Sequence, residues 1–138
     1  MTASEIKEIV DNFLSGDEES AFFTLIELPG DVLPALIEIF RAEPTAEVRA
    51  FLVKAAWERR EKSVIPFLGE ALGASEENVW QQALDGLVAF ASKESLDILQ
   101  HARDREFINA SDGKRFRLWL DEAIAQVQDV ISGRSTLG

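Results

Sequence analysis

The chain has 138 residues, of which 46% are hydrophobic and 28% are charged, and it contains no cysteine. This length suits a single domain, and the composition excludes collagen-like, disordered and transmembrane chains as well as disulfides and cysteine metal sites. Acidic residues outnumber basic residues by 25 to 14, and the resulting net charge of −11 disfavours nucleic-acid binding, which needs a surplus of Lys and Arg.

The spacing of apolar residues is helical along the whole chain. They recur every three or four positions, and neither alternating strand patterns nor hairpin dipeptides such as Asn-Gly occur. The pattern predicts an all-α protein with eight helices joined by short turns, at 3–15, 17–28, 32–42, 46–60, 64–73, 76–91, 96–104 and 112–131.

Several of these helices carry start and stop signals. Glycines are expected to end three of them, at Gly16, Gly30 and Gly73. Side chains that can cap orphan backbone N–H groups stand before six of them, at Thr2, Asp31, Ser63, Ser75, Ser95 and Ser111.

A period links three of the predicted caps. Asp31, Ser63 and Ser95 are 32 residues apart, and prolines stand three positions after the first two, at Pro34 and Pro66. Proline is tolerated in the first helical turn because its missing N–H would have no intrahelical acceptor there. The two prolines therefore indicate a repeated helix start.

The second helix of each unit repeats an apolar face with small residues, which let helices pack closely. Its members share the offsets zero, four, seven and eight: Val48, Leu52, Ala55 and Ala56, then Val79, Ala83, Gly86 and Leu87, and finally Phe116, Leu120, Ala123 and Ile124.

These two-helix units resemble HEAT repeats, most clearly over residues 31–102. The family pattern is carried by Leu33-Pro34-Ala35-Leu36, by Glu47-Val48-Arg49 and by Val64-Ile65-Pro66-Phe67-Leu68. The sequence departs from it at Trp80, where the family usually has arginine, and at Ile98, where the third proline is missing. The resemblance implies one domain over 1–131, built as a short right-handed α-solenoid of about four antiparallel helix pairs, with a flexible tail at 132–138.

Groups that could support catalysis are scarce. His101 is the only histidine, so one chain cannot assemble a two-histidine metal site, and no phosphate loop, Gly-x-Ser-x-Gly or His-Glu-x-x-His pattern occurs. The acidic pairs Glu18/Glu19 and Glu76/Glu77 stand at helix starts, where the helix dipole explains them. We expect no catalytic residue, no metal and no cofactor.

Aromatic residues on the second helices are the candidate binding residues. Phe51, Trp57 and Trp80 fall outside the core offsets, and in a HEAT-like solenoid this ridge would line a concave face. Exposed tryptophan is typical of binding hot spots, but Trp57 and Trp80 could equally fill gaps between repeats, and the sequence leaves both alternatives open. The expected partner-binding set is Phe51, Lys54, Trp57, Glu58, Trp80, Gln81 and Asp85.

A longer connection between Arg103 and Arg117 interrupts the repeat. We expect this connection, around 105–113, to reposition the last helix as an end cap. Trp119 shares that helix with Phe116 and is expected to be buried at the C-terminal end.

The charge is uneven, because residues 1–40 contain nine acidic residues and one basic residue. Such an excess either aids solubility or attracts a basic partner. The leading hypothesis is a non-catalytic, cytoplasmic protein-protein interaction module, a monomer or weak dimer, that binds a protein partner through a concave helical groove and binds neither nucleic acid nor membranes.

The resemblance also implies alternatives. Small HEAT proteins include accessory subunits and immunity-type proteins, and the acidity would suit masking a basic toxin or enzyme domain. Some HEAT-like proteins are DNA glycosylases or bilin lyase subunits, but the first needs a basic cleft that this chain lacks, and the second needs ligand-specific residues that the sequence does not single out. Self-association through the solenoid ends is a third alternative.

Overall fold

The structure is a computed structural model that describes residues 3–133, and these residues form helices and turns without any strand. The helices are α1 (Ala3–Leu14), α2 (Glu18–Glu27), α3 (Leu33–Ala42), α4 (Ala46–Glu58), α5 (Ile65–Leu72), α6 (Glu77–Phe90), α7 (Lys93–His101) and α8 (Ala110–Ile131), with short 3₁₀ turns η1 (Lys62–Val64) and η2 (Ala102–Asp104).

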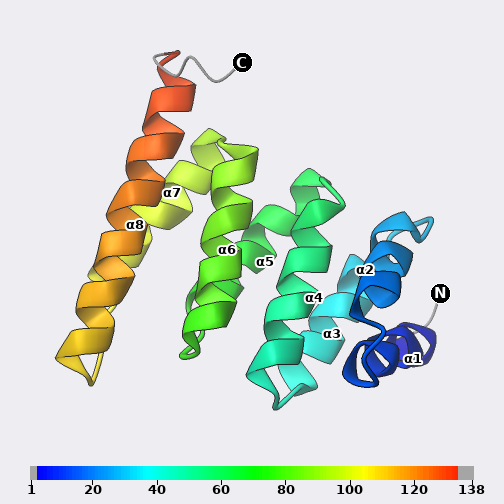
Figure 1. Ribbon diagram of the computed structural model, residues 1–138. Helices are drawn as coiled ribbons and strands as arrows, with labels where there is room; N and C mark the ends of the chain where they lie inside the picture. Colours follow the sequence, from blue (N-terminus) through cyan, green and yellow to red (C-terminus); the bar gives the residue numbers. More distant parts are fainter. Residues whose placement is uncertain (1–2, 134–138) are drawn as a thin grey trace.

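The helices form two layers along one axis (Figure 1). Consecutive helices pair as α1–α2, α3–α4, α5–α6 and α7–α8, and each even-numbered helix also packs against the next even-numbered helix. The layer of α2, α4, α6 and α8 therefore forms one face of the stack, and the odd-numbered helices form the other. The expected all-α solenoid of four helix pairs is confirmed.

The repeated proline marks the helix starts as predicted. Pro34 and Pro66 are the second residues of α3 and α5, so neither removes an intrahelical hydrogen bond. Ahead of α3, the Asp31 carboxylate accepts the backbone N–H of Leu33 at 3.3 Å.

The other predicted caps are wrong or lie outside the described residues. Ser92 caps α7 by accepting the N–H of Ser95 at 3.1 Å, so Ser95 lies buried in the first turn, and the helix starts three residues earlier than predicted. Asn109 replaces Ser111 as the cap of α8 because its Oδ1 accepts the N–H groups of Ser111 and Asp112. Neither Ser63 nor Ser75 caps α5 or α6, and Thr2 is not among the described residues.

The glycine stops differ in conformation. Gly16 and Gly30 have positive φ angles of 101° and 81°, a region that favours glycine, and they follow α1 and α2. Gly73 follows α5 with an ordinary φ of −81°. All three helices end where the sequence predicts, within two residues of the expected positions.

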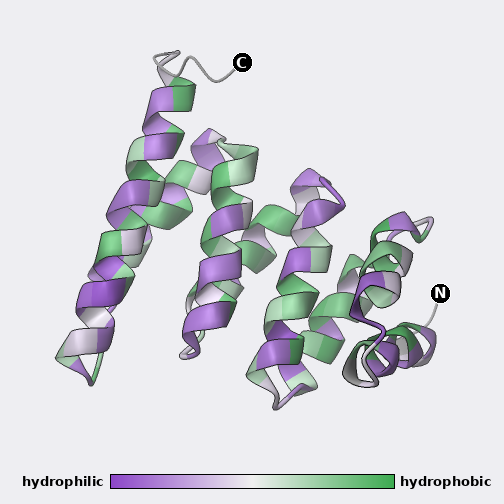
Figure 2. Cartoon of the chain, viewed as in Figure 1, coloured by the Kyte–Doolittle hydropathy of each residue, from purple (hydrophilic) through white to green (hydrophobic). Residues whose placement is uncertain are grey.

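One continuous apolar core runs between the layers. The repeating core positions Leu52, Leu68 and Leu87 are fully buried, while hydrophilic residues lie along the open faces of α4, α6 and α8 (Figure 2). Within residues 3–133, no helix combines the length and the apolar character that crossing a bilayer requires. The expected tail at 132–138 falls mostly on residues 134–138, which are outside the described range.

Candidate functional site

The structure corrects the expected aromatic ridge. Phe51, Trp57 and Trp80 are only 7%, 9% and 3% exposed, so they are not solvent-facing anchors. Each fills a junction between neighbouring repeats, because a helix with a neighbour on both flanks needs large side chains beside its core face as well as on it. Of the two alternatives for Trp57 and Trp80, packing between repeats is the one that the structure shows.

Each of these rings has its own partner in a neighbouring element. Phe51 stacks on Phe13 of α1 with centroids 4.2 Å apart, and Trp80 packs against Phe116 of α8 at 5.1 Å. The Trp57 indole N–H donates to Oε1 of Gln82 at 3.3 Å. These three residues therefore join successive helix pairs.

The polar members of the expected set are more accessible. Lys54 and Asp85 are exposed, and Glu58 and Gln81 are half-buried. Although the residue as a whole is exposed, partial burial of the Asp85 carboxyl raises its pKa above the ordinary value. Asp85 lies away from Lys54, beside a shallow hollow of about 160 Å³ between α6 and α8, so the expected set does not form one site.

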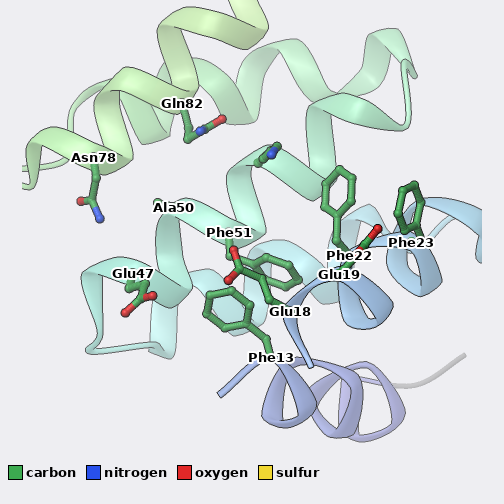
Figure 3. Close-up of a pocket in the computed structure, with 11 residues that line it drawn as sticks. Phe13, Glu18, Glu19, Phe22, Phe23, Glu47, Ala50, Phe51, Asn78 and Gln82 are labelled. Carbon is green, nitrogen blue, oxygen red and sulfur yellow. The ribbon is translucent and has the colours of Figure 1, made fainter. Parts of the chain in front are cut away.

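A groove lies on the even-numbered face, where α2, α4 and α6 meet (Figure 3). Its volume is about 600 Å³. We call it the phenylalanine groove, and its lining consists of Phe13, Glu18, Glu19, Phe22, Phe23, Glu47, Ala50, Phe51, Lys54, Asn78 and Gln82. Of the expected binding residues, only Phe51 and Lys54 belong to it.

Four phenylalanines make the apolar part of the phenylalanine groove. Phe22 meets Phe51 edge to face at 6.4 Å and Phe23 at 5.6 Å, and Phe51 in turn stacks on Phe13. Phe23 is 47% exposed, although the other three rings are buried or half-buried. The groove thus presents one open aromatic side chain beside a packed aromatic base.

The polar part of the phenylalanine groove is acidic. Glu18 and Glu19 come from the first turn of α2, Glu47 comes from the first turn of α4, and all three are exposed. Lys54 is the only basic residue among the described lining residues, and its ammonium lies 5.0 Å from the centre of the Phe22 ring. Asn78 and Gln82 add neutral amides from α6.

Most residues of the phenylalanine groove are absent from the binding set that the sequence predicts. Glu18 and Glu19 were explained by the dipole of α2, which remains true of their position in its first turn. A usable signal was the pair Phe22-Phe23, because consecutive helical residues point about 100° apart, so the two rings do not share one face of α2. Phe13 lies on α1, outside the repeat pattern of residues 31–102.

The lining of the phenylalanine groove suits binding through apolar contact and charge rather than metal chemistry. Among residues 3–133, no group of three or more His, Cys, Asp or Glu side chains is placed to hold a metal ion. His101 lies on α7 in the other layer, with its Nδ1 2.7 Å from the carbonyl oxygen of Asp97.

The C-terminal end differs from expectation at one residue. Trp119 is 45% exposed and not buried, because α8 is the last helix described and its far flank has no neighbour. The connection before α8 is firmly held: Arg105 donates to the carbonyl oxygens of Leu72 and Ala74 at 2.8 Å and covers the ring of Phe107. This anchoring fits an end-capping role for the last helix.

Comparison with known proteins bears on the family alone. No curated protein and no solved structure matches the chain. A family model described as HEAT repeats matches residues 33–109, which is more than half of the 138 residues and spans the stretch from α3 to the connection before α8. The chain therefore belongs to the HEAT-repeat family.

Proposed function

We propose that this protein is a non-catalytic protein-binding module and that its partner binds in the phenylalanine groove between α2, α4 and α6. The observation that carries the proposal is the exposed ring of Phe23 beside half-buried Phe22, at the edge of a groove of about 600 Å³. An aromatic side chain left open next to packed aromatic rings is typical of a contact anchor.

The groove has the composition of a contact surface. Its apolar centre is formed by phenylalanines, and its edge is formed by carboxylates, amides and one ammonium group. Protein interfaces commonly combine an apolar centre with a polar rim in this way. HEAT repeats commonly mediate protein-protein interaction, so membership of the family supports the same class of function.

The non-catalytic part of the proposal rests on the chemistry of the lining. Among the described residues that line it, the groove has no histidine, serine or threonine, and its carboxylates are exposed rather than held against a second catalytic group. Such side chains can orient and attract a partner, and the described lining offers no hydroxyl and imidazole that could act together as a nucleophile and its base.

Site-specific photo-crosslinking tests the location. A photoreactive phenylalanine analogue at position 23 should capture a native partner from the host, whereas the same analogue at Leu118 should not. Leu118 is a matched control because it is also an exposed apolar residue, 63% exposed, but lies on α8 away from the groove.

Affinity of the captured partner gives the second measurement. Phe23→Ala should weaken binding by at least about tenfold, and Leu118→Ala should leave it unchanged, since truncation of a contact anchor costs more than 1 kcal/mol. Both residues are exposed, so both variants should stay folded by circular dichroism. Equal capture at the two positions, or equal affinity of the two variants, would place the binding surface elsewhere.

A further inference from the structure

Resting on the proposed function, we infer that the phenylalanine groove takes a cationic segment of a protein, one in which an apolar side chain stands next to Arg or Lys. The apolar side chain would pack on the exposed ring of Phe23, and the positive group would lie among the carboxylates of Glu18, Glu19 and Glu47. Lys54 would then be a competitor for the cation position, which the partner displaces.

The first support is the state of the three carboxylates. Some glutamates of the molecule are paired with arginines, in the pairs Arg41–Glu70, Arg49–Glu76, Arg59–Glu61 and Arg115–Glu77. Within residues 3–133, Glu18, Glu19 and Glu47 have no such partner. The groove therefore has three unneutralised carboxylates around an apolar centre.

The second support is the position of the Lys54 ammonium. It lies 5.0 Å from the centre of the Phe22 ring, so this ring already presents its face to a cation. A cation over an aromatic face is attracted by the negative potential of the ring. An arginine side chain of the partner could make the same contact and also pair with the carboxylates, which Lys54 does not do in the structure.

The third support is the field around the groove. Residues 1–40, which include α2, hold nine acidic residues and one basic residue. A surface of one sign accelerates encounter with a segment of opposite charge, and an acidic segment would be repelled. Charge complementarity therefore selects a cationic partner over an acidic one.

Short synthetic peptides of equal length provide defined probes. One contains Leu and Arg, a second Leu and Gln, a third Leu and Glu, and a fourth Ser and Arg, and binding to the full chain is measured by fluorescence anisotropy. We expect the Leu/Arg peptide to bind tightest and to weaken with added salt. The Leu/Glu peptide should bind weakest, and the Ser/Arg peptide should show that charge without an apolar anchor is insufficient.

Variants of the groove separate specific binding from general attraction to an acidic protein. Glu18→Gln combined with Glu19→Gln should weaken binding of the Leu/Arg peptide by about three- to tenfold, since two exposed charge pairs are lost. Glu94→Gln is the matched control, because Glu94 is an exposed carboxylate in the first turn of α7, in the other layer. It should change affinity little, and circular dichroism should show that all variants are folded.

Lys54→Met gives the most decisive test, because the affinity of the Leu/Arg peptide should change only if Lys54 competes for the cation position. If Lys54 competes for the cation position, its removal should tighten the Leu/Arg peptide by about two- to fivefold. If Lys54 instead pairs with an acidic partner, the same substitution should weaken the Leu/Glu peptide and leave the Leu/Arg peptide unchanged, which would overturn the inference.

The remaining outcomes distinguish this inference from the proposed function. Binding that depends on Phe23 but is equal for the Leu/Gln, Leu/Glu and Leu/Arg peptides would overturn the cationic partner and keep the groove as the site. Binding of the Leu/Arg peptide that ignores Phe23→Ala, or that Glu94→Gln weakens as much as the groove substitutions do, would show general attraction and overturn both.

Discussion

The indole N–H of Trp57 on α4 donates to Oε1 of Gln82 on α6, at 3.3 Å. Gln82 also lines the phenylalanine groove, so the hydrogen bond connects the packing between two repeats to the wall of the candidate site. A tryptophan that the sequence offers as a solvent-facing anchor thus acts from inside, by holding a groove residue in place. Phe51 has a related position, since it lies under the groove and stacks on Phe13.

The junction around Trp57 also predicts the effect of a glycine substitution. A Cβ atom on Gly86 of α6 would lie 2.9 Å from Cγ of Trp57 and 2.9 Å from Cδ1 of Leu68. Gly86→Ala should therefore destabilise the protein, because overpacking costs about 1–3 kcal/mol and outweighs the gain of about 1 kcal/mol in helix propensity. Chemical denaturation measures the change in the free energy of unfolding.

Gly69→Ala is the matched control for that measurement. Gly69 lies within α5, and a Cβ atom there would meet Cγ2 of Ile98 at 3.4 Å, an ordinary contact distance. This variant should be neutral or more stable by up to about 1 kcal/mol. Stabilisation by both substitutions would mean that α4, α5 and α6 do not approach one another as closely as the structure has them.

The small residue at position 86 illustrates what the sequence could predict. Gly86 and Leu87 follow the offsets set by Val79, so the repeat pattern located the helix faces that pack together. The pattern describes one helix against its partner, whereas Trp57, Trp80 and Phe51 lie on flanks that meet a neighbouring pair in the stack. Which flank residues become buried depends on the distance and angle between pairs, and periodicity does not contain that information.

The phenylalanine groove was beyond prediction for a similar reason. It combines α2, which lies outside the recognised repeat, with α4 and α6, and it depends on the turn at Gly16 that brings α1 beneath α2. Trp119 is the opposite case, since the sequence predicts that it is buried and the structure leaves it exposed. An apolar residue on the last described helix of a stack has no following helix to bury it.

Arg59 predicts a second stability effect. Its guanidinium donates to the carbonyl oxygens of Leu25, Leu28 and Gly30 at 2.9–3.0 Å, and its side chain is only 8% exposed. Arg59→Met would keep the apolar stem but leave these carbonyl groups at the end of α2 without their donor. We expect a loss of about 2–4 kcal/mol in the free energy of unfolding.

The Arg59 prediction has a local readout and a control. Hydrogen exchange should become faster in α2 first, because the end of that helix loses its donor. Arg41→Met removes an arginine that is 64% exposed and pairs with Glu70 at the surface, so it should have a much smaller effect. An equal effect of the two substitutions would contradict a structural role of Arg59 at the end of α2.

A left-handed residue predicts a stabilising substitution. Ala91 follows α6 with a φ of 47°, and its N–H donates to the carbonyl oxygen of Leu87. Glycine adopts this conformation without the cost to an L-residue, so Ala91→Gly should raise the free energy of unfolding by about 0.5–1 kcal/mol. Ala89→Gly, two residues earlier and inside α6, should lower it by about 1 kcal/mol. Thermal melting of both variants measures these changes. A lower melting temperature for both variants would contradict the left-handed conformation at the end of α6.

Two carboxyl groups predict opposite dependences of stability on pH. The hydrogen bond from Arg41 lowers the pKa of Glu70 below its ordinary value of 4.5. A carboxyl group with a lowered pKa in the folded state stabilises the protein above its unfolded pKa, and this contribution disappears as the pH falls through the folded pKa. Burial instead raises the pKa of Asp85 above its ordinary value of 3.8, so its charge opposes folding at neutral pH.

Glu70→Gln should therefore lower the melting temperature at pH 7, and its difference from the wild type should shrink as the pH falls below about 4.5. Asp85→Asn should raise the melting temperature at pH 7, because it removes the cost of partly burying a charge, and its effect should vanish below about pH 3.8, where Asp85 is protonated in both states. Melting curves of the wild type and both variants across this range test the two signs together. A lower melting temperature for Asp85→Asn at pH 7 would mean that the charged carboxylate is stabilised in the hollow between α6 and α8 and not penalised by burial there.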